Sequence, residues 1–388
     1  MELVERLSGL DGQMREWRHH LHAHPELAFE ERATSDFVAE RLEEFGLEVT
    51  RGIAGTGLVG TLRSGDGPAV ALRADLDALP LQEDSGAQWS SRTAGHMHAC
   101  GHDGHTTMLL GAARYLSREP RFTGTVHFVF QPAEETGGGG DAMVRDGLFE
   151  RFPVRGVYGL HNAPPLPRGC FAIRPGPMMA SADDFRLRVR GRGCHAAMPD
   201  LGRDPVVAAA HIITALQTLP SRMVAATDAL VVSVTRMQGG TTWNIIPEEV
   251  FLQGTVRTLK PEIREQARAA IRRVAEGVGS GLGVEVELEY NELFPVLVNH
   301  ARETEVAAEA AASVVGPENV LRDAPPTMGT EDFAHMLNAM PGSYIMLGTG
   351  EQGVAPTSLH SPHYDFNDEA LALGAAYWVS LARKVLGE

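Results

Sequence analysis

One run of apolar residues limits the folds that this chain can adopt. Residues 69–72 (AVAL) have the length of a strand, but they lack the apolar–polar alternation of a strand with one wet face. A strand that is apolar on both sides has to be covered on both faces, which is typical of a parallel sheet between helices. A second strong strand is predicted over 124–130 (GTVHFVF). We therefore expect an α/β fold with a mostly parallel sheet.

The order of the expected elements changes along the chain. The first part alternates between helices at 4–21, 33–45 and 106–116 and strands at 58–62, 69–72, 124–130 and 156–160. From about Ser181 the order becomes strand 185–189, helix 205–219, strands 229–237 and 250–256, helix 262–278 and strand 284–290. This β-α-β-β-α-β order is that of a ferredoxin-like α+β sandwich. The α/β pattern resumes near Phe294 and ends in a helix at 369–386. Since 388 residues exceed what one core usually serves, we predict a domain of residues 1–181 and 294–388 with residues 182–293 inserted into it.

The charge of the chain disfavours two classes of partner. The formal net charge is -16, and the arginines are spread along the chain beside only two lysines, Lys260 and Lys384. A dispersed acidic surface is unsuited to nucleic acid and to anionic membranes. No apolar run approaches the ~18 residues of a membrane span, and the charged N-terminal segment lacks the apolar core of a secretory signal. We expect a folded cytoplasmic protein. Three cysteines, Cys100, Cys170 and Cys194, do not suggest a disulfide framework.

The densest chemical signal is the segment HMHACGHDGH at 96–105. A cysteine and a histidine two residues apart, Cys100 and His102, suit zinc, manganese, cobalt or nickel. The glycines allow the backbone to turn tightly between ligands, and the next helix is expected to begin near Asp103. The alternative is a polar loop with incidental histidines. The density of ligand types favours a metal site.

Two pairs of carboxylates follow expected strands. Glu134 and Glu135 come directly after 124–130, and Asp75 and Asp77 follow 69–72. In open α/β sheets, sites form at the carboxyl ends of strands. One glutamate of such a pair can bind a metal ion while its neighbour acts as a general base. For Asp77 two interpretations stay open: it orients a metal-bound histidine, or it caps the turn before a proline.

Two further histidines occupy similar places. His161 ends the apolar strand at 156–160, and His360 lies in a loop before the last helix. A lone histidine at a strand end is more often structural than a ligand. The combination with the segments above favours the ligand interpretation.

Together these segments resemble the M20 family of metallopeptidases, in the branch of hippurate hydrolases, N-acyl-amino-acid amidohydrolases and auxin-conjugate hydrolases. The resemblance covers nearly the whole chain. It rests on RHHLHAHPEL at 18–27, RADLDALP at 73–80, HMHACGHDGHT at 96–106, QPAEE at 131–135, GLHN at 159–162, GRGCHAAMP at 191–199, GGTTWNIIPEEVFLQGTVRT at 239–258, MGTEDFA at 328–334 and LHSP at 359–362.

The resemblance implies a fold and a set of site residues. The fold is an α/β metallohydrolase catalytic domain with an inserted ferredoxin-like lid or dimerisation domain. The ligands of two divalent metal ions (Mn, Zn, Co or Ni) would be Cys100, His102, Glu135, His161 and His360. Glu134 matches the general base, and His195 matches a lid histidine that reaches a neighbouring subunit's site and steadies the oxyanion. Asn244 and Arg257 are candidates for gripping the substrate carboxylate.

The implied activity is hydrolysis of the amide bond of N-acyl amino acids, of the N-acetyl or N-benzoyl type, by a homodimer or homotetramer joined through the lid domain. N-acetylated diamino acids are also open as substrates. The alternative is a dipeptidase or carboxypeptidase with the same metal site. A non-catalytic binding protein would need a broken ligand set, and a structural zinc domain would hold its ligands close in sequence. The sequence departs from the family pattern at Asp200, where a histidine is common, and at Thr330, where serine is frequent.

Overall fold

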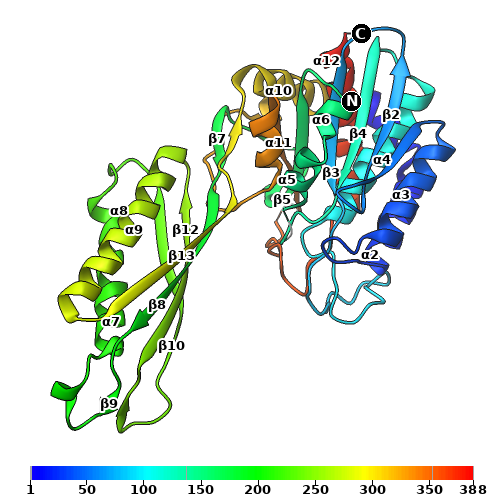
Figure 1. The fold of residues 1–388 in the computed structure, drawn as a ribbon. Helices are drawn as coiled ribbons and strands as arrows, with labels where there is room; N and C mark the ends of the chain where they lie inside the picture. The colour runs from blue at the N-terminus through cyan, green and yellow to red at the C-terminus, as the bar shows by residue number, and fades with distance from the viewer. Residues whose placement is uncertain (1, 137, 352, 388) are drawn as a thin grey trace. The chain divides into compact units, whose positions relative to one another are not determined.

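The computed structural model describes residues 2–136, 138–351 and 353–387, which form two compact units (Figure 1). The first unit consists of residues 1–176, 298–325 and 332–388, and the second of residues 177–297 and 326–331. The second unit therefore starts before and ends after the predicted insertion at 182–293. It also takes in the short segment 326–331, which the sequence prediction assigned to the other domain.

The first unit is built on an eight-stranded mixed sheet in the order β1-β2-β4-β3-β5-β16-β6-β15. Its strands are β1 (Glu48–Ile53), β2 (Gly57–Ser64), β3 (Ala69–Asp75), β4 (Gly124–Gln131), β5 (Val157–Pro167), β6 (Phe171–Ala172), β15 (Val320–Leu321) and β16 (Gly342–Gly350). The central strands β4, β3, β5 and β16 are parallel to one another, and antiparallel pairs flank them. The carboxyl ends of these central strands therefore share one edge of the sheet.

Helices cover both faces of this sheet, as the apolar strands require. They are α1 (Glu2–Ser8), α2 (Asp11–Ala23), α3 (Arg32–Glu44), α4 (His102–Arg118), α5 (Gly139–Arg145), α6 (Leu148–Arg151), α10 (Ala301–Val315), α11 (Phe333–Ala339) and α12 (Leu371–Leu386). Val126, Phe128 and Phe130 of β4 point into a large core that α2, α3, α4, α10 and α12 close. Val129, on the opposite face, is buried too, and α5 and α11 contact β4 and β5. This arrangement confirms the predicted α/β fold.

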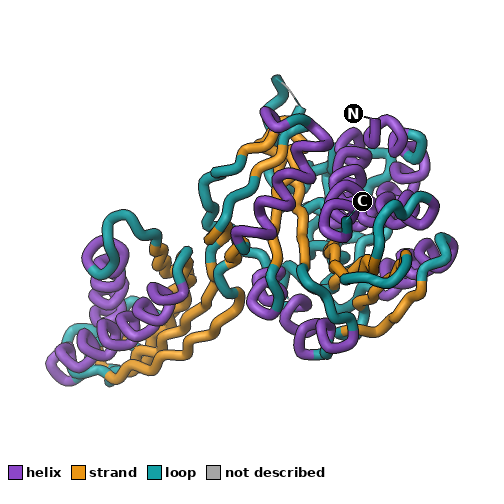
Figure 2. Tube along the Cα trace, turned by 90° about the horizontal axis from the view of Figure 1, so that it is seen from above, coloured by secondary structure: helices purple, strands orange, loops and turns teal. Residues whose placement is uncertain are grey.

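The second unit is an antiparallel four-stranded sheet with helices packed against it (Figure 2). Its main elements are β8 (Ser181–Arg190), α7 (Pro205–Leu216), α8 (Thr218–Arg222), β10 (Leu230–Gly239), β12 (Glu249–Thr258), α9 (Pro261–Leu282) and β13 (Glu285–Phe294). The strand order β10-β12-β8-β13 places the first and third strands at the centre, as in a ferredoxin-like sandwich. Shorter strands of this unit are β9 (Cys194–His195) and β11 (Ile245–Ile246), and the residues of β7 (Gly176–Met179) and β14 (Leu297–Asn299) are divided between the two units.

Two expected helices are each divided in the structure. The helix predicted over 205–219 is α7 and α8, separated at Gln217. The helix predicted over 4–21 is two helices, α1 and α2, separated at Gly9 and Leu10. The apolar spacing continues across the break, so periodicity did not reveal it. Among the described helices, none is long and apolar enough to cross a membrane.

Candidate metal and active site

The candidate ligands come from four loops or strand ends of the first unit. Cys100 lies in the loop that leads into α4, and Gly101 caps this helix with a φ of 91°, a left-handed conformation that favours glycine. This turn directs Cys100 and His102 to the same place. Glu134 and Glu135 follow β4, as predicted. His161 lies within β5, which continues to Pro167 rather than ending at the histidine, and His360 lies in the loop before α12.

The structure brings these side chains together. Donor atoms within 4.8 Å of one another occur in three overlapping groups: Cys100, His102 and His161; Cys100, Glu135 and His360; and His102, Glu134 and Glu135. The Cys100 Sγ atom lies 3.4 Å from His161 Nε2, and Glu135 Oε1 lies 3.2 Å from His360 Nε2. All five candidate ligands therefore converge beside Glu134, although Cys100 and His360 are far apart in the sequence.

Two of the histidines are oriented as metal ligands usually are. His102 Nδ1 lies 2.9 Å from the Asp77 carbonyl oxygen, and His161 Nδ1 lies 2.7 Å from the Asn162 carbonyl oxygen. A carbonyl accepts from N–H, so the proton of each neutral ring is held on Nδ1 and Nε2 keeps its lone pair. This outer hydrogen bond to a backbone carbonyl accompanies most histidines that bind metal ions.

The chemistry of the buried donor atoms fits divalent cations. His102 Nε2 is buried and has no hydrogen-bond partner in the described part of the chain, and the buried Glu135 Oε1 has only its ion-pair contact with His360 Nε2. Leaving such atoms unsatisfied costs about 1–3 kcal/mol each. Burial, followed by the Glu135 carboxylate, raises the pKa of the Cys100 thiol well above its ordinary value. A thiolate here therefore requires a cation beside it.

The Asp77 carboxylate lies beside the candidate ligand His102, as the first interpretation expects, and its hydrogen bond is to the turn after β4 rather than to the turn before Pro80. Its Oδ2 atom accepts a hydrogen bond of 2.9 Å from the Glu135 backbone N–H, which holds the turn after β4. Its Oδ1 atom lies 3.3 Å from His102 Nδ1. One carboxylate thus orients a candidate ligand from α4 and the backbone of another after β4.

A second group of buried residues was missed by the sequence analysis. His105 Nδ1 lies 2.7 Å from Asp75 Oδ1, and His105 Nε2 lies 2.6 Å from Asn162 Oδ1. All three side chains are buried, and the His105 ring lies 4.5 Å from that of His161. The available signal was the spacing of His102 and His105, because residues three apart share one face of a helix.

The backbone is strained at two of these places. Ala133, just before Glu134, has a φ of 54°, and His360 has a φ of 62°. A non-glycine residue in the left-handed region costs about 1–3 kcal/mol and persists only where surrounding contacts impose it. At Ala133 the contact is a hydrogen bond of 2.8 Å from its N–H to the buried Glu31 carboxylate.

His195 and Asn244 lie in the second unit, on a small two-stranded sheet formed by β9 and β11. His195 pairs with Ile245, the residue after Asn244. The Ala197 N–H donates to His195 Nδ1 at 3.1 Å, so the proton of a neutral ring is on Nε2. His195 is exposed. The ring therefore offers an N–H donor to solvent.

Arg257 is on β12 of the same unit. Its guanidinium donates to Thr330 Oγ1 at 3.2 Å, and burial lowers the pKa of Arg257. Thr330, one of the departures from the family pattern, thus contacts a candidate substrate-binding residue. Asp200, the other departure, is exposed in a short 3₁₀ turn, Pro199–Leu201.

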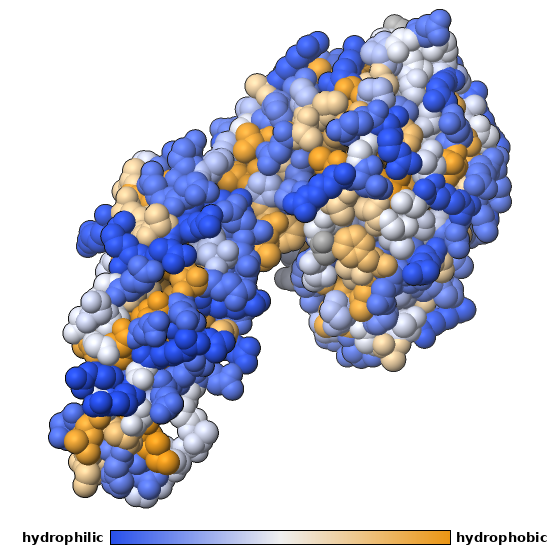
Figure 3. Space-filling model, in the orientation of Figure 1, coloured by the Kyte–Doolittle hydropathy of each residue, from blue (hydrophilic) through white to orange (hydrophobic). Residues whose placement is uncertain are grey.

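Exposed apolar side chains surround the small β9–β11 sheet. Met198 is 53%, Ile245 55% and Trp243 92% exposed. Apolar residues are visible at this end of the second unit in Figure 3. A tryptophan this exposed is unusual for a surface that faces only water.

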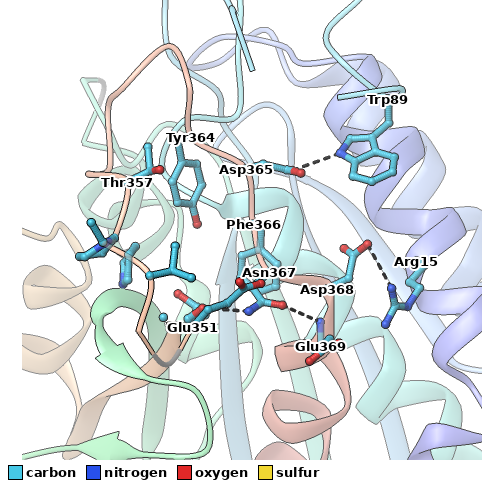
Figure 4. Close-up of a pocket in the computed structure, with 16 residues that line it drawn as sticks. Arg15, Trp89, Glu351, Thr357, Tyr364, Asp365, Phe366, Asn367, Asp368 and Glu369 are labelled. Atoms are coloured by element: carbon cyan, nitrogen blue, oxygen red, sulfur yellow. Dashed lines mark hydrogen bonds and ion pairs between the residues drawn. The ribbon is translucent and has the colours of Figure 1, made fainter. Parts of the chain in front are cut away.

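A cavity of about 430 Å³ opens in the first unit, lined by residues 349–351, 354–357 and 364–369 together with Arg15, Trp89 and Pro164 (Figure 4). None of the candidate ligands lines it. Two of its acidic groups have partners: Asp365 accepts from Trp89 Nε1 at 3.1 Å, and Asp368 pairs with Arg15. Tyr364, which also lines it, accepts from Asn162 Nδ2 at 2.7 Å.

Comparison with known proteins identifies the family of the chain. The profile of Peptidase family M20/M25/M40 matches residues 71–384. The hippurate hydrolase of Campylobacter jejuni is 39% identical over 387 residues, covering 100% of both chains. An N-acetylcysteine deacetylase of Bacillus subtilis is 38% identical and covers 95% of this chain and 96% of its own.

A solved structure described as a dinuclear metal-binding peptidase of the M20 family, from Bacillus subtilis, has a TM-score of 0.86. It is 35% identical and covers 98% of this chain and 99% of its own. The family profile spans most of the chain, and both curated relatives match it over nearly its full length. The chain therefore belongs to the peptidase family M20/M25/M40.

Proposed function

We propose that this protein is a metal-dependent amidohydrolase that cleaves the amide bond of N-acyl amino acids, releasing a free amino acid and a carboxylate. The observation that carries the proposal is that five candidate metal ligands converge beside the carboxylate of Glu134, at the carboxyl end of β4. The names of the relatives support the substrate class, since hippurate and N-acetylcysteine are both N-acyl amino acids.

In this proposal the metal ligands are Cys100, His102, Glu135, His161 and His360, and they hold two divalent ions. Bound there, such ions supply a hydroxide near neutral pH and polarise the amide carbonyl. A set of thiolate, imidazole and carboxylate donors accommodates manganese, zinc, cobalt or nickel. The buried unsatisfied atoms described above support this assignment.

Glu134 is the general base in the proposed reaction. It accepts the proton of the attacking water and then passes it to the departing amine. Its side chain is 7% exposed, and its carboxylate lies in the same group of donor atoms as His102 and Glu135. This position suits a base that acts on a water molecule held among the ligands.

The second unit contributes the remaining roles. His195 donates its Nε2 proton to the oxyanion of the tetrahedral intermediate, and Asn244 and Arg257 bind the substrate carboxylate. The support is the tautomer of His195, which its hydrogen bond from Ala197 favours. A guanidinium matches a carboxylate in charge and in the spacing of its donors.

We further propose a homodimer or homotetramer, joined through the second unit, that works in the cytoplasm. In this assembly His195 acts in the site of the neighbouring subunit. The exposed apolar side chains around β9 and β11 support an association surface there.

A hydrolysis screen of the metal-reconstituted protein tests the proposed function. The panel contains N-acetyl, N-benzoyl and indole-acetyl amino acids, N-acetylated diamino acids, and dipeptides with the same C-terminal residues. We expect release of free amino acid from at least one N-acyl class, abolished by Glu134→Gln. Faster cleavage of the dipeptides would favour the dipeptidase or carboxypeptidase alternative, and no hydrolysis with any of the four metals would overturn the proposal.

A further inference from the structure

We infer that Asp332, held by Arg73 and Gln131, is a positioning residue for the general base Glu134. This inference rests on the proposed function, because it concerns the same site. Asp332 lies at the start of α11, 198 residues along the chain from Glu134. Its backbone N–H donates to Glu134 Oε1 at 3.3 Å. A donor fixed to one carboxylate oxygen favours one rotamer of the Glu134 side chain.

The side chain of Asp332 is what holds that N–H in place. Its Oδ1 atom accepts from Gln131 Nε2 at 2.7 Å and from Arg73 at 3.1 Å. Its Oδ2 atom accepts from the Gly140 N–H at 2.7 Å and also from Gln131. Both oxygens are therefore fully engaged, and Asp332 is completely buried.

The backbone of α5 packs tightly against Asp332 at Gly140. A Cβ atom added there would lie 2.8 Å from the Asp332 carbonyl oxygen and 3.1 Å from Oδ1. Only glycine lets the backbone of α5 approach Asp332 this closely. The segment before α11 is thus clamped from β4 and from α5.

Arg73 connects Asp332 to residues that contact the candidate metal ligand His102. Its guanidinium is 0% exposed and donates to Gln131 Oε1 at 2.8 Å and to Asp75 Oδ2 at 2.7 Å, besides Asp332. Asp75 in turn contacts His105 and lies 3.8 Å from His102. The buried Arg73 guanidinium therefore links β3, β4 and the start of α11. The relative positions of these three elements determine where Glu134 lies relative to the candidate ligands.

A purely structural ion pair would explain the burial of Arg73, but it would not explain the contacts that hold the turn around Glu134. The turn that carries Glu134 is held at three other positions as well: Gln131 by Arg73 and Asp332, Ala133 by Glu31, and Glu135 by Asp77. Glu134 lies in this turn, and the Asp332 N–H is one of the groups that contact its side chain. A misplacement of about 1 Å in such a group can cost ~10²-fold in rate.

A double-mutant cycle on kcat tests the inference in the full-length, metal-reconstituted enzyme. Asp332→Asn replaces an acceptor oxygen by an NH₂ group facing the Gly140 N–H and the Gln131 amide. We expect kcat to fall by about 10- to 100-fold. KM and metal content should stay within about twofold of the parent, since neither substrate nor ligands are touched. In a Glu134→Ala background the same change should lower the residual kcat by less than about twofold, because the residue that it positions is gone.

Two further variants keep the test decisive. Asp368→Asn is the matched control, because Asp368 is also bound by a fully buried arginine, with Arg18 Nε 2.7 Å away. It should alter the melting temperature without the loss of kcat. If Asp332→Asn does not fold, Gln131→Met retains all charges, removes two hydrogen bonds to Asp332, and should show the same dependence on Glu134.

The outcomes separate this inference from the proposed function. Equal losses in both backgrounds, or a loss no larger than that of Asp368→Asn, would overturn the positioning role alone. Near-normal turnover of Glu134→Ala would instead overturn the assignment of the base, and the positioning role with it.

Discussion

The two parts of the proposed site are built in opposite ways. In the first unit, His102, Glu134 and Asp332 are buried, and hydrogen bonds from other strands and helices fix them. In the second unit, His195 is exposed on a two-stranded sheet, and a neighbouring residue of its own loop fixes its tautomer. From this difference we expect the proposed metal site to be organised before substrate binds. We expect the proposed oxyanion donor, His195, to be fixed in place only when substrate or another subunit is present.

The largest expected effect comes from the buried part. Glu134→Gln keeps the size of the side chain and removes its basicity, so kcat should fall by about 10²–10⁴-fold. The melting temperature and metal content should remain near those of the parent protein, because Glu134 is not a proposed ligand. Steady-state kinetics with metal analysis check this. Near-normal turnover would show that another group is the base.

The exposed part should matter less for rate and not at all for folding. His195→Ala should lower kcat by about 10²–10³-fold, the usual cost of losing one oxyanion donor. Thermal unfolding should be unchanged, since the side chain is exposed. His211→Ala, which removes an exposed histidine of α7 in the same unit, is the control and should leave kcat unchanged.

Mixing two inactive variants tests whether His195 acts in a neighbouring subunit. If His195 acts in a neighbouring subunit, subunit exchange between His195→Ala and Glu134→Gln creates some sites with both groups intact. Activity should return to a fraction of the parent level. Failure to recover activity after verified exchange would mean that His195 acts within its own subunit or has another role.

The smallest effect concerns a buried histidine that lies outside the site. His127 on β4 contacts Thr61, and burial lowers the pKa of His127 to about 4. Between pH 4 and 6.5 the unfolded state binds the proton and the folded state does not, so the free energy of unfolding should rise with pH across this window. Over the whole window the contribution is on the order of 3 kcal/mol.

His127→Asn should flatten that slope, as measured by urea unfolding at several pH values, and leave kcat unchanged. An unaltered slope would mean that other groups carry the pH dependence. A loss of activity in His127→Asn would mean that residues of the first unit beyond those described above contribute to catalysis.

The sequence was informative where chemistry and periodicity coincide. The apolar strands β3 and β4, the ferredoxin-like order of the second unit and the grouping of ligand types near Cys100 were all predictable. β16 was missed, although it is a central strand, because its apolar run is short and glycines flank it. Pairing with β5 and β6 makes it a strand, and such long-range pairing leaves little local signal.

The residues that support the site were harder to find than its ligands. Arg73 did leave a signal: a charged residue at the end of an apolar run has to be paired if the strand is buried. The sequence could not identify its partner, because Asp332 is 259 residues away. Only the fold shows that this pair reaches Glu134.

The most direct test of the central claim is an anomalous-diffraction map of the protein reconstituted with manganese or zinc. We predict two peaks in the first unit, within bonding distance of donor atoms of Cys100, His102, Glu135, His161 and His360, with Glu134 beside them. Peaks at other side chains, or no ordered metal with these five residues intact, would contradict the account.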